Sequence, residues 1–375
     1  MNKYFDTFYD WWKNIDKTIF LIISLLFALG LFFSLVSTSI IASDKLNTNS
    51  YYFFLKHLIF VLIGIFLILF LSLLDQKILI RLSVVLFVIT FISLFLVPLI
   101  GVEVKGSKRW LDIGSLPRFQ PIETLKPFFV IVISLIISLE KKNLYIKYLL
   151  SSVILVPIII LLLSQPDLGQ TLLIISVWRA IIFVSGINLL LFAISLLAVG
   201  SLTLFLVFLV PKFEYIRIRL MSFLDNSSGN NYQADKASDA ISSGSFFGKG
   251  IGEGTLNSRI PEAHTDYIIS VIAEEFGVII LIGIILLYLI LSYRVLKKIN
   301  FTKNNNFKLI LVGSISIILL QTFIHIGVNI RMLPTTGMTM PFISYGGSSI
   351  VGTSILTGII LNLTKRKLNL SLIHI

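Results

Sequence analysis

Apolar residues run through this chain in long stretches separated by short polar segments, from near the N-terminus almost to the C-terminus. Stretches of about eighteen or more apolar residues are long enough to cross a bilayer as helices. The pattern predicts about ten such spans, near 18–41, 52–74, 78–100, 124–139, 148–165, 170–187, 189–210, 266–293, 309–330 and 343–363. We therefore expect an all-α integral membrane protein, one polytopic domain over residues 1–375, with a large extracytoplasmic loop between spans seven and eight.

The composition agrees with a membrane solvent. Hydrophobic residues make up 56% of the 375 residues and charged residues only 13%, against about 25% charged residues in soluble domains. The chain has no cysteine, which excludes a disulfide framework and a thiolate metal site. Its net charge of +12 does not indicate nucleic acid, because the basic residues lie in short clusters between apolar runs. Such clusters are typical of topology signals and headgroup contacts.

The distribution of Lys and Arg predicts the orientation. With an even number of spans, both ends lie on one side, and the stretch 18–41 is too long for a cleavable signal and stays as the first span. One side carries sixteen basic residues: Lys3, Lys13, Lys17, Lys77, Arg81, Lys141, Lys142, Lys147, Arg294, Lys297, Lys298, Lys303, Lys308, Lys365, Arg366 and Lys367. Residues 1–17 and 364–375 are therefore expected in the cytoplasm, and the loops 101–123 and 211–265 in the periplasm.

Two polar clusters lie at the ends of spans on the predicted outer side. In the first, residues 106–114 precede a segment in which Pro121 suits the first turn of a helix, so that Glu123 and Lys126 share a helix face. These two residues form either an ion pair near the membrane or a charged wall of a polar cavity. In the second, Gln165-Pro-Asp-Leu-Gly-Gln170, Asp167 either caps the following helix or belongs to a site.

The third cluster is a glycine-rich stretch over 242–254, which leads into a segment that ends at Asp266. Glycine-rich backbone can approach a phosphate through its amides, although the signal is weak without a strand and helix around it. Asp266 opens an apolar helix, where an acid serves either as an N-cap or as a catalytic base. Glu274 and Glu275 follow on that helix, and we expect them to pair with Arg179 of span six, because charges at membrane depth need partners.

The fourth cluster is the run Leu333–Ser349, rich in glycine, proline and hydroxyl side chains at the end of an apolar region. Such residues indicate either a discontinuous helix that lines a cavity or close helix packing. No internal repeat is apparent, which weakens the case for a transporter built from inverted repeats.

Taken together and in this order, the clusters resemble the SEDS family (shape, elongation, division and sporulation) of peptidoglycan polymerases. The resemblance rests on five motifs that span nearly the whole chain: Arg109-Trp-Leu111, Gln120-Pro121 with Glu123 and Lys126, Gln165–Gly169, His264-Thr-Asp266 with Ala273-Glu-Glu275, and Pro341–Ser349. The run 333–341, with Tyr232-Gln233 and residues 262–266, is more similar to the member that acts in division than to the elongation member. Departures are Ile122, Gln170 and Arg179.

The resemblance implies glycosyl transfer from lipid II, a disaccharide-pentapeptide on undecaprenyl diphosphate, at the outer face of the bacterial inner membrane, with Asp266 as general base. The positive charge needed by the leaving diphosphate would come from Lys108, Arg109, Arg217, Arg219, Lys249 and Arg259. The substrate-binding residues are expected to be Arg109, Glu123, Lys126, Asp167, Lys249, Arg259, His264 and Ser344.

The resemblance also implies partners: a class B penicillin-binding protein transpeptidase and other membrane proteins of the division machinery. No metal ligands are predicted, although a divalent cation such as Mg²⁺ or Mn²⁺ could share the charge of the diphosphate. Three alternatives stay open. The chain could be a lipid II flippase without catalysis, the elongation-type polymerase, or a scaffold in which Asp266 is replaceable.

Overall fold

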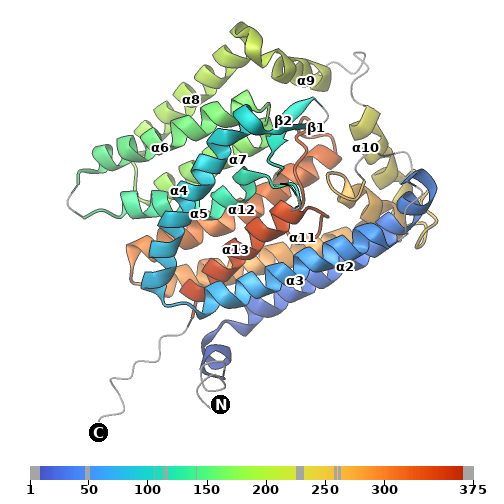
Figure 1. The fold of residues 1–375 in the computed structure, drawn as a ribbon, viewed down its shortest axis with the longest axis horizontal. Helices are drawn as coiled ribbons and strands as arrows, with labels where there is room; N and C mark the ends of the chain where they lie inside the picture. Colours follow the sequence, from blue (N-terminus) through green and yellow to red (C-terminus); the bar gives the residue numbers. More distant parts are fainter. Residues whose placement is uncertain are drawn as a thin grey trace.

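The computed structural model describes residues 9–46, 51–104, 106–112, 114, 117–140, 142–224, 232–256, 260 and 263–365. Ten long helices in these residues form one elongated bundle (Figure 1). They are α2 (Lys17–Leu46), α3 (Tyr52–Leu73), α4 (Gln76–Ile100), α5 (Pro121–Ile137), α6 (Leu144–Ser164), α7 (Leu168–Val184), α8 (Leu189–Leu209), α11 (Ile268–Phe301), α12 (Asn305–Asn329) and α13 (Gly347–Leu363). Each corresponds to one predicted span, so the all-α polytopic fold is confirmed.

Length and composition separate these helices into groups. Seven are long and apolar enough to cross a membrane, and α7 and α13 are shorter apolar helices. The tenth, α5, carries Glu123 and Lys126 in its first turns, yet nearly all of its side chains are buried. It is the central helix of the bundle, in contact with α4, α6, α7, α12 and α13. Its charges therefore face protein rather than lipid, as charges at this depth require.

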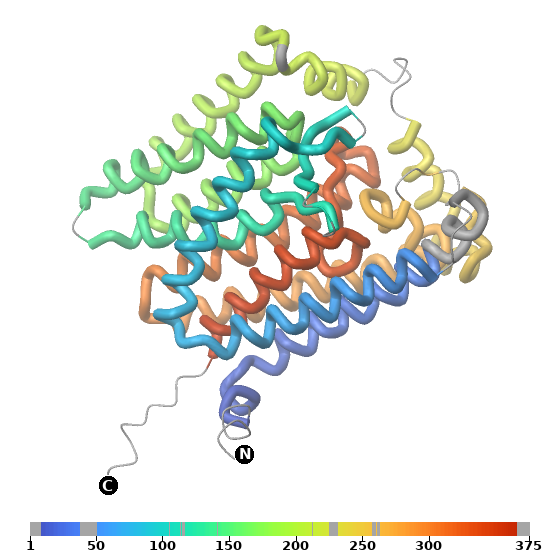
Figure 2. Tube along the Cα trace, viewed as in Figure 1, coloured from blue at the N-terminus to red at the C-terminus, as the bar shows by residue number. Residues whose placement is uncertain are grey.

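The first and last of these helices meet at one end of the bundle, here called the terminal end. Asn362 near the end of α13 donates hydrogen bonds to Leu71 O at 2.8 Å and Leu74 O at 2.7 Å, beside the end of α3. Figure 2 shows α2 and α3 side by side along one edge. Helix α2 begins and α13 ends at the terminal end, as an even number of passes requires. The opposite end is called the cavity end.

Asp16 ties the start of α2 to the end of α11. Its carboxylate accepts from the amides of Thr18 and Ile19 at 3.1 and 3.2 Å, which caps α2, and lies 3.1 Å from Lys298 Nζ and 3.5 Å from Arg294 Nη2. Burial alone would raise the pKa of this carboxyl. The Ile19 amide and the two cations outweigh it and hold the pKa below the ordinary value of 3.8. The contact therefore persists at neutral pH.

The two loops at the cavity end contain elements that hydrophobic periodicity does not reveal. Between α4 and α5 lies an antiparallel hairpin of β1 (Val102–Val104) and β2 (Ser107–Trp110). The segment 211–265 contains the 3₁₀-helix η1 (Pro211–Phe213), α9 (Glu214–Leu224) and α10 (Tyr232–Gly244), which packs against α11.

Helix α11 is interrupted at Gly277, where φ is 81° and ψ is 172°. The glycine-rich segment 244–250 fills the interruption. Val278 N donates to Ser245 O at 3.0 Å, and the Glu274 and Glu275 carbonyls accept from the amides of residues 249 and 250 at 2.8 and 3.1 Å. The break is thus satisfied by a second piece of backbone.

Glycine is required where these two backbones meet. A Cβ atom on Gly248, whose φ is +79°, would lie 2.2 Å from Glu275 O, and one on Gly277 would lie 2.2 Å from Phe246 O. Only glycine allows this approach in the left-handed region. Within the described residues, the amides of this segment therefore serve a structural contact with α11.

The expected pairing of Arg179 with Glu274 or Glu275 is wrong. Glu274 is fully buried and accepts from Lys249 Nζ at 3.0 Å and from the amides of residues 255 and 256 at 2.9 and 3.0 Å. Arg179 instead donates to backbone carbonyls of residues 195 and 196 on α8 at 3.3 and 3.4 Å. Glu274 lies near the start of α11 at the cavity end, whereas Arg179 lies in the second half of α7 and faces α8.

Candidate active site

A cavity of about 1390 Å³ lies at the cavity end of the bundle. Its wall is contributed by α3, the β-hairpin, α5, α9, the segment 263–267 and the irregular stretch between α12 and α13. Segments from every part of the chain therefore meet at one place. Five of the residues that were expected to act in the site line the cavity: Arg109, Glu123, Arg219, His264 and Asp266.

The charged side chains of the wall are mostly cationic. Four cations line the cavity against two carboxylates: Lys56, Arg109, Arg118 and Arg219 against Glu123 and Asp266. A concave wall with an excess of positive charge attracts anionic ligands. The guanidinium of Arg219 is fixed by a hydrogen bond to Thr335 O at 3.2 Å, and it lies over the ring of Tyr215. Helix α9, which the pattern of spans did not predict, thus contributes a positive charge to the site.

The backbone that carries Asp266 is clamped by α12 and by the segment before α13. The three successive carbonyls of residues 264–266 accept hydrogen bonds from Tyr345 N at 3.1 Å, Ser344 Oγ at 2.7 Å and Asn329 Nδ2 at 3.1 Å. The clamp fixes the main chain while the side chain of Asp266 lines the cavity. Sequence reasoning missed Asn329, although a polar side chain at the end of an apolar span is a signal in itself.

Asp266 lies one residue before the N-cap position of the helix that follows it. Helix α11 begins at Ile268, and its N-cap position is Tyr267, which makes no side-chain capping bond. Burial raises the pKa of the Tyr267 phenol, and the negative charge of Asp266 raises it further. Tyr267 therefore remains protonated beside the carboxylate.

The side chains of Asp266 and Arg109 border one open space beside the Cα atom of Gly337. A Cβ atom on Gly337 would lie 3.4 Å from Asp266 Oδ2 and 3.8 Å from Arg109 Nη1. Gly337 has a φ of +69°, which favours glycine. The absence of a side chain thus keeps the space between an acid and a cation open.

The second polar cluster, residues 165–170, orients the side chain of Arg109. Its Nε donates to Gln165 O at 3.1 Å, its Nη2 donates to Pro166 O, and its Nη1 lies 3.8 Å from Asp167 Oδ2. Asp167 also accepts from Gln170 N at 3.3 Å as the N-cap of α7. The predicted capping role of Asp167 is therefore confirmed, and the same carboxylate supports the guanidinium.

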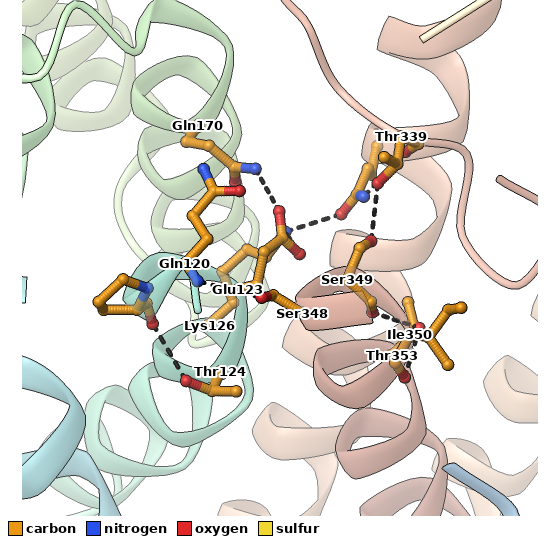
Figure 3. A network of polar contacts seen from close by, with 12 residues as sticks. Gln120, Glu123, Thr124, Lys126, Gln170, Thr339, Ser348, Ser349, Ile350 and Thr353 are labelled. Carbon is orange, nitrogen blue, oxygen red and sulfur yellow. Dashed lines mark hydrogen bonds and ion pairs between the residues drawn. The ribbon is translucent and has the colours of Figure 1, made fainter. Parts of the chain in front are cut away.

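A continuous polar network runs along the cavity wall and into the protein behind it (Figure 3). Glu123 Oε2 lies 2.9 Å from Lys126 Nζ, which donates to Gln321 Oε1 at 2.9 Å. Gln321 Nε2 in turn donates to Thr339 O at 2.9 Å, and Thr339 Oγ1 donates to Ser349 Oγ at 2.7 Å. Glu123, Thr339 and Ser349 line the cavity, so both alternatives for the Glu123–Lys126 pair hold: it is an ion pair and part of the wall.

Gln170 is a buried partner of Glu123. Its Nε2 donates to Glu123 Oε1 at 2.5 Å. The sequence comparison with the family pattern marked this position as a departure, and the structure gives it a role in holding Glu123. The carboxylate therefore has a cation on one side and an amide on the other.

The remaining predicted site residues lie elsewhere. Lys126, Asp167 and Ser344 are buried behind the wall, and Lys249 pairs with Glu274 at the break in α11. Arg259 lies outside the described residues. His264 lines the cavity, and its ring contacts those of Phe53 and Tyr345, with centroids 5.2 and 5.7 Å away.

In the part of the chain that the structure describes, no three metal-ligating side chains gather. These residues do not form a protein cage for a divalent cation.

The fold and the site define a polytopic helical membrane protein with a cavity, lined mostly by cations among its charged groups, at one end of the bundle. Comparison with protein families identifies the class: the model of the FtsW, RodA and SpoVE cell cycle proteins matches residues 16–369. The chain belongs to this family.

Relatives and solved structures agree. The chain is 31% identical over 367 residues to a probable peptidoglycan glycosyltransferase FtsW of Caulobacter vibrioides, covering 95% of this chain and 91% of that protein. It is 34% identical to the Coxiella burnetii protein of the same name, covering 90% and 93%.

Among solved structures, a chain of a peptidoglycan synthase complex that coordinates polymerization and crosslinking aligns with a TM-score of 0.77, 26% identity and coverage of 93% and 97%. The rod shape determining protein RodA of Thermus thermophilus has the same fold, with a TM-score of 0.69, 24% identity and coverage of 93% and 96%.

Proposed function

We propose that this chain is a peptidoglycan glycosyltransferase of the division type, which polymerises lipid II into glycan strands in the cavity around Asp266. The observation that carries the proposal is the shared approach of the Asp266 carboxylate and the Arg109 guanidinium to the open position above Gly337. An acid and a cation around one open space are what glycosyl transfer with an anionic leaving group needs. The names of the relatives support the reaction.

In the proposed reaction the 4-hydroxyl of the acceptor sugar attacks the anomeric carbon of the donor. A C–O bond forms there, and the bond from that carbon to the polyprenyl diphosphate breaks. Asp266 accepts the hydroxyl proton, and the diphosphate leaves with the electron pair of the broken bond. Arg109, Arg219, Arg118 and Lys56 neutralise its charge. Glu123, held by Lys126 and Gln170, borders the same space.

The proposal includes an orientation. The sixteen basic residues that the sequence predicts on the side of the two ends favour a cytoplasmic location for both termini. The cavity then opens at the outer face of the bacterial inner membrane, where lipid II is consumed. A peptidoglycan synthase complex among the solved neighbours supports a class B penicillin-binding protein as a partner of this chain. Other membrane proteins of the division machinery belong to the same proposal.

A lipid II flippase is the competing function. It would need a headgroup pathway along Glu123, Lys126, Arg179, Glu274 and Glu275. These residues lie in three separate places: Glu123 and Lys126 at the cavity wall and just behind it, Arg179 against α8, and the two glutamates at the break in α11. Their separation supports the transferase over the flippase. The division role over elongation is supported by the FtsW relatives.

The test is polymerisation of lipid II by the purified full chain with its transpeptidase partner. Asp266→Asn keeps the shape of the side chain but removes the base, and we expect a loss on the order of 10²–10⁴-fold. Asp239→Asn is the matched control, because Asp239 is an exposed acid on α10 paired only with Lys236 in a surface bridge. Near-normal glycan synthesis by Asp266→Asn would show that Asp266 is not the general base, whereas no synthesis by the unaltered chain would favour the flippase or the scaffold.

A further inference from the structure

The loop that enters the break in α11 exposes large apolar side chains. Phe246, Phe247 and Ile251 are 68%, 84% and 64% exposed. They lie on the segment whose backbone is fixed to α11 on both sides of Gly277. A rigid segment with outward-facing phenylalanines needs an apolar surface to cover them.

The position of this loop along the axis of the bundle shows which apolar surface can cover the phenylalanines. The part of α11 from Val278 to Arg294 is roughly 24 Å long at 1.5 Å per residue. Arg294 contacts Asp16 at the start of α2, which marks the terminal-end boundary of the membrane spans. The hydrocarbon core of a bilayer is about 30 Å thick. The break, and the loop bound to it, therefore lie close to the opposite boundary of the hydrocarbon.

The exposed side chains continue the lipid-facing surface of α11. Ile279 N donates to Phe246 O at 3.4 Å, which joins the loop to the first turn after the break. Ile279 and Ile282 are themselves exposed on the apolar part of α11. On the other side of the break, the ring of Phe276 contacts those of Phe32 and Phe33 on α2. The surface on both sides of the break is therefore apolar.

The backbone of the loop is suited to this environment. Irregular backbone does not lie against lipid inside the hydrocarbon core, so a loop of this kind belongs at the boundary of the core, with its backbone covered by protein. The amides of residues 248–250 bond to the carbonyls of residues 244, 274 and 275, and the carbonyls of residues 245 and 246 bond to the amides of residues 278 and 279. The loop can therefore touch lipid without unpaired groups at these positions.

We propose that residues 245–251 form a re-entrant anchor that inserts Phe246 and Phe247 into the lipid leaflet at the cavity end. The occupant of this surface is the boundary between the headgroups and acyl chains of that leaflet. The anchor goes beyond the glycosyltransferase activity and does not depend on it. Its consequence is that Asp266, joined to the anchor by the first turns of α11, is held at a fixed height relative to the bilayer.

The absence of cysteine in the chain permits a clean test. Single cysteines replace Phe247, Ile282 on the lipid face of α11, and Asp239 on α10, which is exposed at 56% of its side chain. Each full-length variant carries one nitroxide in lipid nanodiscs. Electron paramagnetic resonance then measures its collisions with oxygen, which concentrates in lipid, and with a water-soluble nickel chelate.

We expect the ratio of oxygen to nickel accessibility at Phe247→Cys to be several-fold above that at Asp239→Cys and close to that at Ile282→Cys. High nickel accessibility at position 247 would overturn the anchor, because the loop would be in water. Low accessibility to both reagents would also overturn it, because a protein surface would then cover the loop. The side chain of Phe247 is 84% exposed, so we expect its replacement to leave the fold intact.

Discussion

Asp266 and Arg109 approach the same point from opposite segments of the chain, 3.4 and 3.8 Å from the position that a Cβ atom on Gly337 would occupy. Asp266 is held there through its backbone, and Arg109 through the carbonyls of residues 165 and 166. Neither group needs to move for a substrate atom to enter between them. The glycine at position 337 therefore protects the space in which the proposed reaction occurs.

Gly337→Ala should reduce polymerisation of lipid II strongly. The new methyl group occupies the space between acid and cation, and displacement of reacting groups by an ångström can cost about 10²-fold in rate. The φ of +69° adds roughly 1 kcal/mol of backbone strain.

Gly186→Ala separates the two effects. Gly186 also has a positive φ, of +93°, but a Cβ atom there would meet nothing within 4 Å. Both variants should lose similar stability in thermal unfolding, whereas only Gly337→Ala should lose activity. Equal activities for the two variants would contradict this role of Gly337.

Ser344→Ala should weaken the hydrogen bonds that hold the backbone of residues 264–266. The hydroxyl donates to Thr265 O at 2.7 Å and accepts from Met340 N at 2.8 Å, so its loss costs about 1 kcal/mol and loosens the residue before Asp266. We expect kcat for polymerisation to fall by about tenfold with little change in KM, because positioning is lost rather than substrate contact.

The control for that variant is Ser83→Ala. Ser83 is equally buried, but its hydroxyl donates only within its own helix, to Leu79 O at 2.8 Å. Its removal should leave kcat unchanged. A rise in KM at constant kcat for Ser344→Ala would instead indicate that Ser344 binds substrate, as the sequence resemblance implied.

The spans and the polar clusters could be predicted because their signals are local. Ten apolar runs gave ten helices, and the cap at Asp167 and the helix start at Pro121 follow from residue type and position. The placement of Arg109, Glu123 and Asp266 in one cavity agrees with the expectation that polar residues at one end of the spans converge.

The partners of these residues could not be predicted, because they come from distant parts of the chain. Lys126 meets Gln321 across 195 residues, and Asp266 meets Asn329 across 63. The break at Gly277 was missed for a related reason. The residues on both sides of it are helical, and the backbone of the distant loop 244–250 inserts at the interruption.

Arg179→Leu should stabilise the protein. The guanidinium donates only to carbonyls on α8 in the described structure, at 3.3 and 3.4 Å, and its Nε is buried without a hydrogen bond. An arginine at the centre of a membrane helix costs roughly 3 kcal/mol on insertion scales, so leucine should raise the midpoint of unfolding in a detergent titration. Polymerisation should be unchanged. A lower midpoint would show that Arg179 makes a contact worth more than its burial costs.

Lys126→Ala should be strongly destabilising. Its amine lies 2.9 Å from Glu123, and both side chains are almost fully buried, at 1% and 5% exposure. Removing one member leaves a buried charge without compensation, which costs about 3–5 kcal/mol. The double variant Glu123→Gln with Lys126→Met removes both charges and should recover most of the loss in thermal unfolding.

A surface pair with the same geometry provides the comparison. Arg217 and Glu214 are also three residues apart on a helix and 2.9 Å from one another, but they are 42% and 59% exposed. Water screens such a pair, so Arg217→Ala should cost less than about 1 kcal/mol. If Lys126→Ala and Arg217→Ala shift the unfolding midpoint equally, burial does not set the strength of the Glu123–Lys126 pair.

If the double variant is as stable as the wild type but inactive, the charge of Glu123 is needed in the cavity for polymerisation, beyond its place in the packing of α5.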